Sequence, residues 1–323
     1  MEHAAEVYFN NICTRVAPFS VSRSGNASDI GKQRRYGLLS TTDPSADSQR
    51  EFAALVKQKL QRGCPNGAPL DISPKAYTYP NNGFYFDSET EQVSAATTNI
   101  AQMQTDGVTT ILWLSGYETR HSEAAANAEW YPEWVVAGDL QNDQLEENQY
   151  NNGFPGGQHP DSFQYAWFVS PQLREDRSSD QPCRTAFRES FPDGTNEMES
   201  ESCGMYRGYF MLFRSIQVAG PVLTPDAMDQ GNHAVKRQES ISPHVAACFF
   251  DPGDYSCVKD AQESWWDPDA PDPRGGNAAT GCLRMVNDGV RRLASTWPEG
   301  DATAEMQPDN VCNQPGDNSS NIQ

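Results

Sequence analysis

The segment Val108–Leu114, with the sequence VTTILWL, limits the fold more than any other part of the chain. Every residue in it is apolar or β-branched, so it predicts a strand that has no face exposed to water. Segments with the apolar spacing of amphipathic helices lie on both sides of it, followed by further short apolar runs. Because buried strands alternate with amphipathic helices, we expect an α/β fold with a parallel sheet covered by helices on both faces.

Apolar spacing and turn residues predict the order of the elements. We expect strands at residues 36–39, 84–86, 108–114, 134–137 and 163–169. We expect helices at residues 2–16, 48–62, 88–106, 118–128, 184–191 and 205–219. Two helix starts, at Ser48 and Ser88, match the capping box, in which serine and glutamate side chains bond the first free amides. The aromatic stripe at 205–219 predicts core packing, and turn formers from residue 238 onward predict irregular chain.

Charge excludes some classes of partner. The chain has 24 basic and 44 acidic residues and a net charge of −20, so it repels nucleic acid and anionic membranes. Its densest basic cluster, Lys32–Arg35, predicts a solvated loop. No apolar run approaches the roughly 18 residues that a membrane span needs, and Met1–Val7 has no signal-peptide character. We expect neither a nucleic-acid partner nor a membrane span in this sequence.

The chain contains 8 cysteines, and none forms a CxxC pair of the kind that zinc and redox motifs use. An even, scattered set in an acidic, turn-rich chain predicts disulfides in an oxidising compartment, with buried free thiols as the alternative. The short-range candidates are Cys183 with Cys203, and one bridge among Cys248, Cys257 and Cys282. The sequence leaves the choice between these pairings open.

Candidate binding residues follow three of the predicted strands, at the carboxyl ends where ligands of open parallel sheets bind. They are Thr41, Thr42 and Asp43 after the first strand, Ser115, Gly116 and Tyr117 after Val108–Leu114, and Asp139 after residues 134–137. Gly116 would admit a close backbone approach, Ser115 offers a hydroxyl, Tyr117 a flat wall and Asp139 a carboxylate for an ammonium group. The alternative is that all seven are ordinary turn and cap residues.

Enzymatic motifs are missing from the sequence. Its five histidines are dispersed, no phosphate-binding glycine loop is present, and Ser115 lacks the preceding glycine of a nucleophile elbow. The acidic run Asp267, Asp269 and Asp272 alternates with prolines that oppose a tight calcium loop. We therefore expect a protein that is not an enzyme and that carries no metal or cofactor.

Residues 106–139, DGVTTILWLSGYETRHSEAAANAEWYPEWVVAGD, resemble the second lobe of type I periplasmic solute-binding proteins, the leucine/isoleucine/valine-binding-protein-like receptors of ABC importers. AAEVYFNNIC and RRYGLLSTTD are similar to the entry into that lobe. MYRGYFMLFRSIQVAG followed by LTPDAM resembles a late helix of the family, and the segment from DPGDYSC to GCLRMV resembles its cysteine-bearing branch. The order of these segments carries the resemblance, which covers most of residues 2–295.

The resemblance implies the type I periplasmic-binding-protein fold, with Rossmann-like sheets and a ligand cleft between two lobes. It implies that Tyr117 lines the cleft, that Asp139 meets the ligand's amino group, and that Thr41–Asp43 border the same cleft. The implied function is that of the solute-binding component of an ABC importer. Its implied location is extracytoplasmic, either in the periplasm or as a cell-surface lipoprotein. It would bind a small amino-acid-like ligand and dock on a membrane permease. An extracellular sensing or interaction domain with the same fold is the alternative.

The sequence differs from the family pattern at the start of the chain, where it has no counterpart of the βαβ series that begins the first lobe. We therefore expect a truncated protein or fragment with an incomplete first lobe. The expected parts are residues 1–32 as a helix and crossover linker, and residues 33–158 as a complete second lobe. Residues 159–295 would form the rest of the first lobe with the hinge, and residues 296–323 a disordered tail.

Overall fold

The computed structural model of this chain describes most of its length. The described residues are 1–80, 89–114, 120–137, 164–171, 182–192, 202–235, 243, 246–254, 256–271 and 280–312. The predicted strand at 84–86 and the predicted helix start at Ser88 lie outside them.

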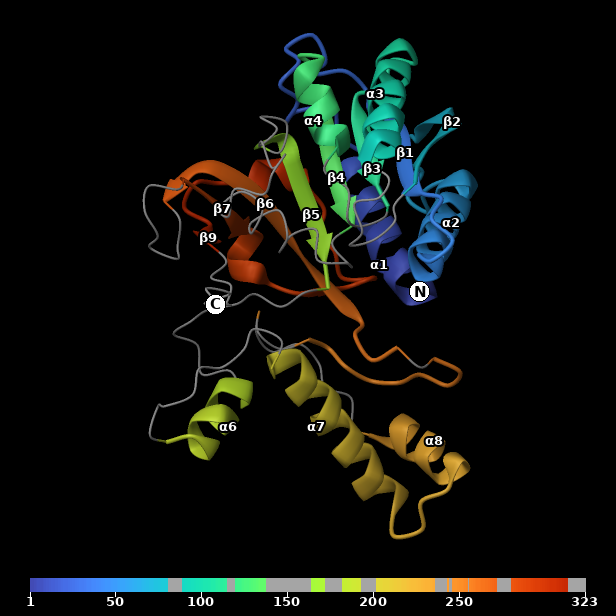
Figure 1. Cartoon of the computed structure of the whole chain (residues 1–323), viewed down its shortest axis with the longest axis vertical. Coiled ribbons are helices and arrows are strands. Elements are labelled where there is room, and N and C mark those ends of the chain that lie inside the picture. The colour runs from blue at the N-terminus through green and yellow to red at the C-terminus, as the bar shows by residue number, and fades with distance from the viewer. Residues whose placement is uncertain are drawn as a thin grey trace.

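Within the described part of the chain, one sheet of 9 strands organises the fold (Figure 1). Its parallel part has the order β2-β1-β3-β4-β5, and antiparallel strands continue it beyond β5. The parallel strands are β1 (Arg35–Thr41), β2 (Asp71–Tyr79), β3 (Thr110–Trp113), β4 (Glu133–Ala137) and β5 (Ala166–Ser170). The antiparallel strands are β6 (Asp260–Pro271), β7 (Thr280–Met285), β8 (Arg292–Leu293) and β9 (Val311–Cys312).

Helices cover both faces of the parallel part. One face packs against α1 (Glu2–Asn11), the π-helical turn η1 (Ile12–Val16) and α2 (Asp47–Arg62). The other packs against α3 (Glu89–Thr105) and α4 (Arg120–Asn127), which stand beside the strands in Figure 1. The core is accordingly split into two apolar clusters, with Leu112 of β3 in one and Ile111 in the other.

Strand β3 confirms the prediction made from VTTILWL. It lies between β1 and β4, and all four of its residues are buried. Because side chains of a strand alternate between faces, a strand with helices on both sides needs apolar residues at every position. The doubly covered α/β fold predicted from the sequence is therefore confirmed.

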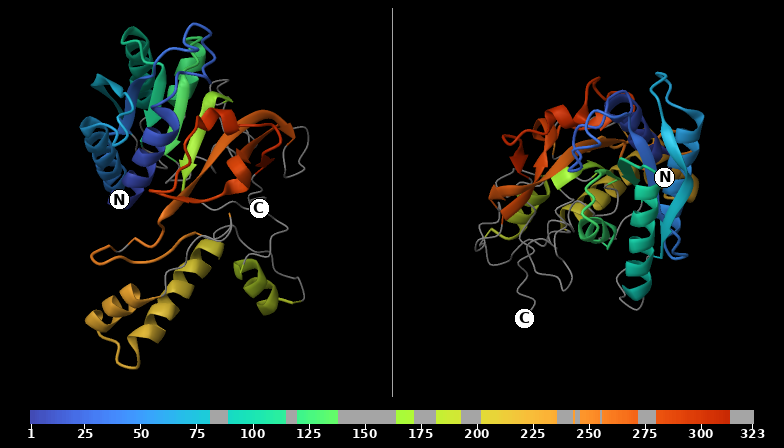
Figure 2. Two further views of the ribbon diagram at one scale, coloured as in Figure 1. Left: turned by 180° about the vertical axis from the view of Figure 1, so that it is seen from behind. Right: turned by 90° about the horizontal axis from the view of Figure 1, so that it is seen from above.

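Three helices lie away from the sheet, below it in Figure 1 and again in the rear view of Figure 2. They are α6 (Pro182–Ser190), α7 (Ser202–Ala219) and α8 (Pro225–Ala234). α7 and α8 meet so closely at Gly231 that a Cβ there would lie 2.5 Å from the carbonyl oxygen of Ser215.

The predicted core packing of the α7 aromatic stripe is wrong in this structure. Tyr209 is 59% exposed and Phe213 is 60% exposed, because α7 does not pack against the sheet. Apolar spacing shows that a helix has an apolar face, but the packing partner of that face is a property of the tertiary structure.

One helix start differs from the sequence prediction, and one helix was not predicted. Helix α2 begins at Asp47 after Ala46, with no side-chain cap, so the capping box at Ser48 is not formed. Pro225, in the segment LTPDAM, opens α8, where Thr224 caps the helix by accepting a hydrogen bond of 3.1 Å from the amide of Ala227. Proline is well suited to the first helical position because its missing amide proton is not needed there.

The C-terminal region is more regular than composition predicts. The segment DPDAP, at residues 267–271, belongs to strand β6, which pairs with β7. Strand β5, which follows residue 159 in the chain, pairs with β4, which precedes it, so one sheet contains strands from both sides of the lobe boundary expected at 158/159. Trp297 is 7% exposed and donates from Nε1 to the carbonyl oxygen of Val7 at 3.1 Å. The disordered tail therefore does not begin at residue 296.

Disulfides join distant parts of the chain. The three described in full are Cys13–Cys64, Cys248–Cys257 and Cys282–Cys312. Of the short-range candidates, Cys248–Cys257 is confirmed, whereas Cys282 pairs with Cys312 instead. Cys183 is also disulfide-bonded, and the side chain of Cys203 lies outside the described residues.

The basic cluster at residues 32–35 is not a fully solvated loop. Arg34 is 1% exposed and makes a bidentate ion pair with Glu133, with Nε–Oε2 and Nη2–Oε1 distances of 2.7 and 3.0 Å. This pair ties the segment before β1 to the first residue of β4. Among the described helices, none has the length and apolar character of a membrane span.

Candidate ligand-binding site

The carboxyl ends of the parallel strands lie at one edge of the sheet. β1, β3, β4 and β5 pair in parallel register, so Thr41, Trp113, Ala137 and Ser170 end neighbouring strands on the same side. In parallel α/β sheets this edge is where loops leave for helix N-termini and where ligands bind. The sequence prediction that these strand tips share an edge is consistent with this pairing.

Four of the seven predicted binding residues lie outside the described residues, namely Ser115, Gly116, Tyr117 and Asp139. The last described residues before them are Leu114, which follows β3, and Ala137, which ends β4, and both are buried. The roles assigned to the four residues therefore stay predictions.

The other three predicted residues form a hydrogen-bonded turn after β1. The hydroxyls of Thr41 and Thr42 both donate to the carbonyl oxygen of Tyr79 at 3.3 Å. Thr41 Oγ1 also accepts from the Asp43 amide at 3.0 Å. Both threonine hydroxyls thus hold the turn against β2, which is the structural role considered as the alternative above.

Asp43 is the residue of this turn with an unused polar atom. It is 6% exposed, and its Oδ1 accepts from the amide and the hydroxyl of Ser45 at 2.8 and 2.7 Å. Its Oδ2 is buried and has no hydrogen-bond partner among the residues that the structure describes. A buried acceptor without a partner costs about 1–3 kcal/mol, more for a charged group, so a donor supplied by a ligand or water would be stabilising.

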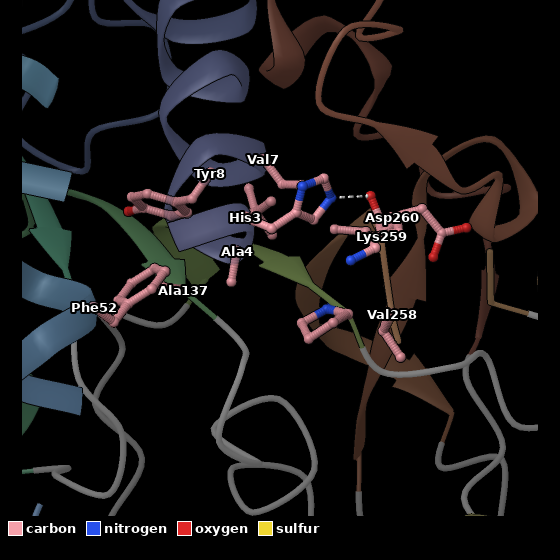
Figure 3. Close-up of a pocket in the computed structure, with 12 residues that line it drawn as sticks. His3, Ala4, Val7, Tyr8, Phe52, Ala137, Val258, Lys259 and Asp260 are labelled. Carbon is pink, nitrogen blue, oxygen red and sulfur yellow. Dashed lines mark hydrogen bonds between the residues drawn. The ribbon is translucent and has the colours of Figure 1, made fainter. Parts of the chain in front are cut away.

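A small void lies near the ends of β4 and β5, between α1 and the first residues of β6 (Figure 3). Its volume is about 40 Å³, and Tyr8, Phe52 and Ala137 form its apolar side. His3 approaches from α1 and bonds the carbonyl oxygen of Lys259 through Nε2 at 2.8 Å. A space of this size holds about one water molecule, so it is not a ligand cleft.

Lys259 beside this void is held by its own ion pair. Its side chain is 0% exposed and is bound to the carboxylate of Asp254 and the carbonyl oxygen of Ser256. Burial alone would raise the pKa of Asp254, but hydrogen bonds from Lys259 and from the Ser256 amide outweigh it and lower that pKa. The lysine therefore has a structural partner and is not poised for chemistry.

A larger groove starts at the carboxyl edge and runs between α2 and β2. Its volume is about 520 Å³, and it begins at Thr41, Thr42 and Leu114. Sequence reasoning missed this groove because β2 itself was not predicted. The sequence DISPKAYTY contains a proline and lacks a continuous apolar run, as an exposed edge strand can. Among the described residues, no group of three or more His, Cys, Asp or Glu side chains could hold a metal ion.

Comparison with solved structures identifies the fold. The chain is similar to a fatty acid ABC transporter substrate-binding protein from Thermomonospora curvata, with a TM-score of 0.52, 12% identity, and coverage of 91% of this chain and 66% of that chain. A second similar structure is an extracellular ligand-binding receptor from Rhodopseudomonas palustris HaA2, with a TM-score of 0.43, 11% identity, and coverage of 80% and 63%. A third is an ABC transporter solute-binding protein from R. palustris in complex with 4-hydroxybenzoate, with a TM-score of 0.43, 14% identity, and coverage of 77% and 58%.

The chain therefore has the type I periplasmic-binding-protein fold, as the resemblance of its sequence implied. It spans 66% of the length of the Thermomonospora curvata protein and smaller shares of the other two. No protein-family model matches the sequence, and no curated protein is similar to it in sequence.

Proposed function

We propose that this protein is the solute-binding component of an ABC-type importer and that it binds a small amino-acid-like ligand. The observation that carries the proposal is the type I fold, with β1, β3 and β4 ending at one edge. The ligand contacts that we propose are Thr41–Asp43, Ser115–Tyr117 and Asp139. The function is binding and not catalysis.

An extracytoplasmic location is part of the proposal. Three disulfides join Cys13 to Cys64, Cys248 to Cys257 and Cys282 to Cys312, and disulfides persist in oxidising compartments. The proteins of similar structure are ABC transporter binding proteins and an extracellular receptor, which agrees with this location.

Ligand binding would act by shifting a conformational balance. A ligand that contacts two lobes only when they are closed favours the closed state by the difference in its affinity for the two states. We assign the sheet body to one lobe and α6–α8 to the other, and the closed state would dock on a membrane permease. This assignment replaces the lobe boundary that was expected between residues 158 and 159, because β4 and β5, which lie on either side of that position, pair in one sheet.

Asp43→Asn is expected to weaken binding of L-leucine at least about tenfold, since we propose that Asp43 shares the ligand's ammonium group with Asp139 and the variant removes its charge-assisted bond. Calorimetry and NMR titration with L-leucine at millimolar concentration measure this, followed by the other common amino acids. Asp47→Asn is the matched control, because Asp47 is the first residue of α2, close to Asp43 in the chain, and its side chain is 84% exposed.

Tyr117→Ala and Asp139→Ala test the other proposed contacts. Each should make the free energy of ligand binding less favourable by a few kcal/mol at most. If no amino acid binds the unmodified protein, the proposed ligand class is wrong. If the amino acids bind but none of the three variants changes the affinity, the ligand lies elsewhere.

A further inference from the structure

The groove between α2 and β2 owes its shape to an irregularity in the edge strand. Tyr36 pairs with Ile72 and Leu38 with Ala76, so the three residues Ser73–Lys75 stand opposite Gly37 alone. Such a bulge bends the strand locally, and bulges are common at sheet edges and beside binding sites. In Figure 1, α2 and β2 lie at the same end of the sheet, where β2 has no further strand beside it.

The groove has an apolar floor and a polar, cationic rim. Leu38 and Leu114 of the sheet and Ala53 of α2 are buried in it. Hydroxyl and amide side chains also line it, together with three cations, Arg50, Lys57 and Lys75. None of its described lining residues is a carboxylate, although the chain as a whole has a net charge of −20. The volume of about 520 Å³ lies in the range of roughly 300–1,000 Å³ of small-molecule sites.

The three cations differ in their partners. Lys75 pairs with Asp106 at 2.7 Å, and Arg50 pairs with the exposed carboxylate of Asp47. Lys57 is exposed and has no ion pair among the described residues. It therefore leaves one cation of the rim available to an anion.

We propose that this groove is a second binding site, which adjoins the carboxyl-edge contacts at Thr41 and Thr42 but extends away from them between α2 and β2, and that it binds a small organic carboxylate with a short aliphatic part. The carboxylate would pair with Lys57, and the aliphatic part would cover Leu38 and Ala53 on the floor. Burial of the aliphatic part supplies affinity, and the ion pair sets the preference for an anion.

Hexanoate is the probe for this site. NMR titration of the full chain at low ionic strength should show saturable shifts from hexanoate and much weaker ones from hexylamine. The Lys57→Glu variant should bind hexanoate at least about tenfold more weakly, because reversing the charge replaces attraction by repulsion. Lys59→Glu carries the same charge change on the same helix but does not line the groove, so it should bind hexanoate as the unmodified protein does.

Several results would overturn the proposal. They are no saturable binding of hexanoate, equal binding of hexylamine, or equal losses in the Lys57→Glu and Lys59→Glu variants. Circular dichroism of both variants checks that each remains folded. The groove proposal and the proposed function fail separately, because Asp43→Asn should leave hexanoate binding unchanged while Lys57→Glu should leave L-leucine binding unchanged.

Discussion

Replacing Glu133 with alanine is expected to lower the free energy of unfolding by about 3–5 kcal/mol. Glu133 is 0% exposed and accepts five hydrogen bonds. Two come from the guanidinium of Arg34, two from the amides of Ser22 and Arg23, and one from the hydroxyl of Thr110. The substitution leaves a guanidinium buried without its carboxylate, which is more costly than the absence of the whole pair.

Urea unfolding followed by circular dichroism measures this loss. The neighbouring pair Arg35–Asp71 is the matched control, since its side chains are 35% and 47% exposed. Asp71→Ala should lower the free energy of unfolding by less than about 1 kcal/mol, because water screens an exposed pair. The double variant Arg34→Met/Glu133→Leu should recover part of the stability lost in Glu133→Ala. A loss in Glu133→Ala no larger than in Asp71→Ala would contradict the argument.

Removing the Cys13–Cys64 disulfide by alanine substitution is expected to lower the free energy of unfolding by about 4 kcal/mol. The bond closes a loop with a sequence separation of 51, so it removes much conformational entropy from the unfolded chain. It links η1 to the end of α2, and Asn66 adds a hydrogen bond of 2.8 Å to the carbonyl oxygen of Cys13. The expected loss is therefore comparable to that of a buried ion pair.

The Cys248–Cys257 disulfide provides the comparison. Its sequence separation is 9, so its removal should lower the free energy of unfolding by only about 2.5 kcal/mol. Equilibrium unfolding in denaturant, with the remaining disulfides kept oxidised, compares the two double-alanine variants. A larger loss from the short loop than from the long one would show that native-state packing, and not loop closure, decides the stabilisation.

The parallel core could be predicted because its signals are local. Every residue of VTTILWL is apolar or β-branched, which indicates a central strand, and the amphipathic spacing of α2 and α3 predicts helices beside it. The edge strand β2 was missed for the opposite reason. One of its faces meets water, and Pro74 interrupts its pattern, so its pairing with β1 decides its structure.

The candidate site was predicted only as a position in the fold. The loop positions after β1, β3 and β4 follow from strand order, which local sequence indicates. The groove between α2 and β2 could not be predicted. It depends on the bulge at Ser73–Lys75 and on how α2 packs beside β2, so that Lys57 lines the same groove as the bulge.

The sequence by itself determined the fold class and favoured disulfides over free thiols. Strand burial shows in the residue types of one short segment, and the use of disulfides is indicated by the even, scattered set of cysteines. Only the tertiary structure decided that Arg34 from a basic loop is buried against Glu133, 99 positions away. It also decided that Cys282 joins Cys312 and that the aromatic face of α7 stays exposed. Each of these depends on which distant group comes within contact distance, and residue type and spacing do not encode that choice.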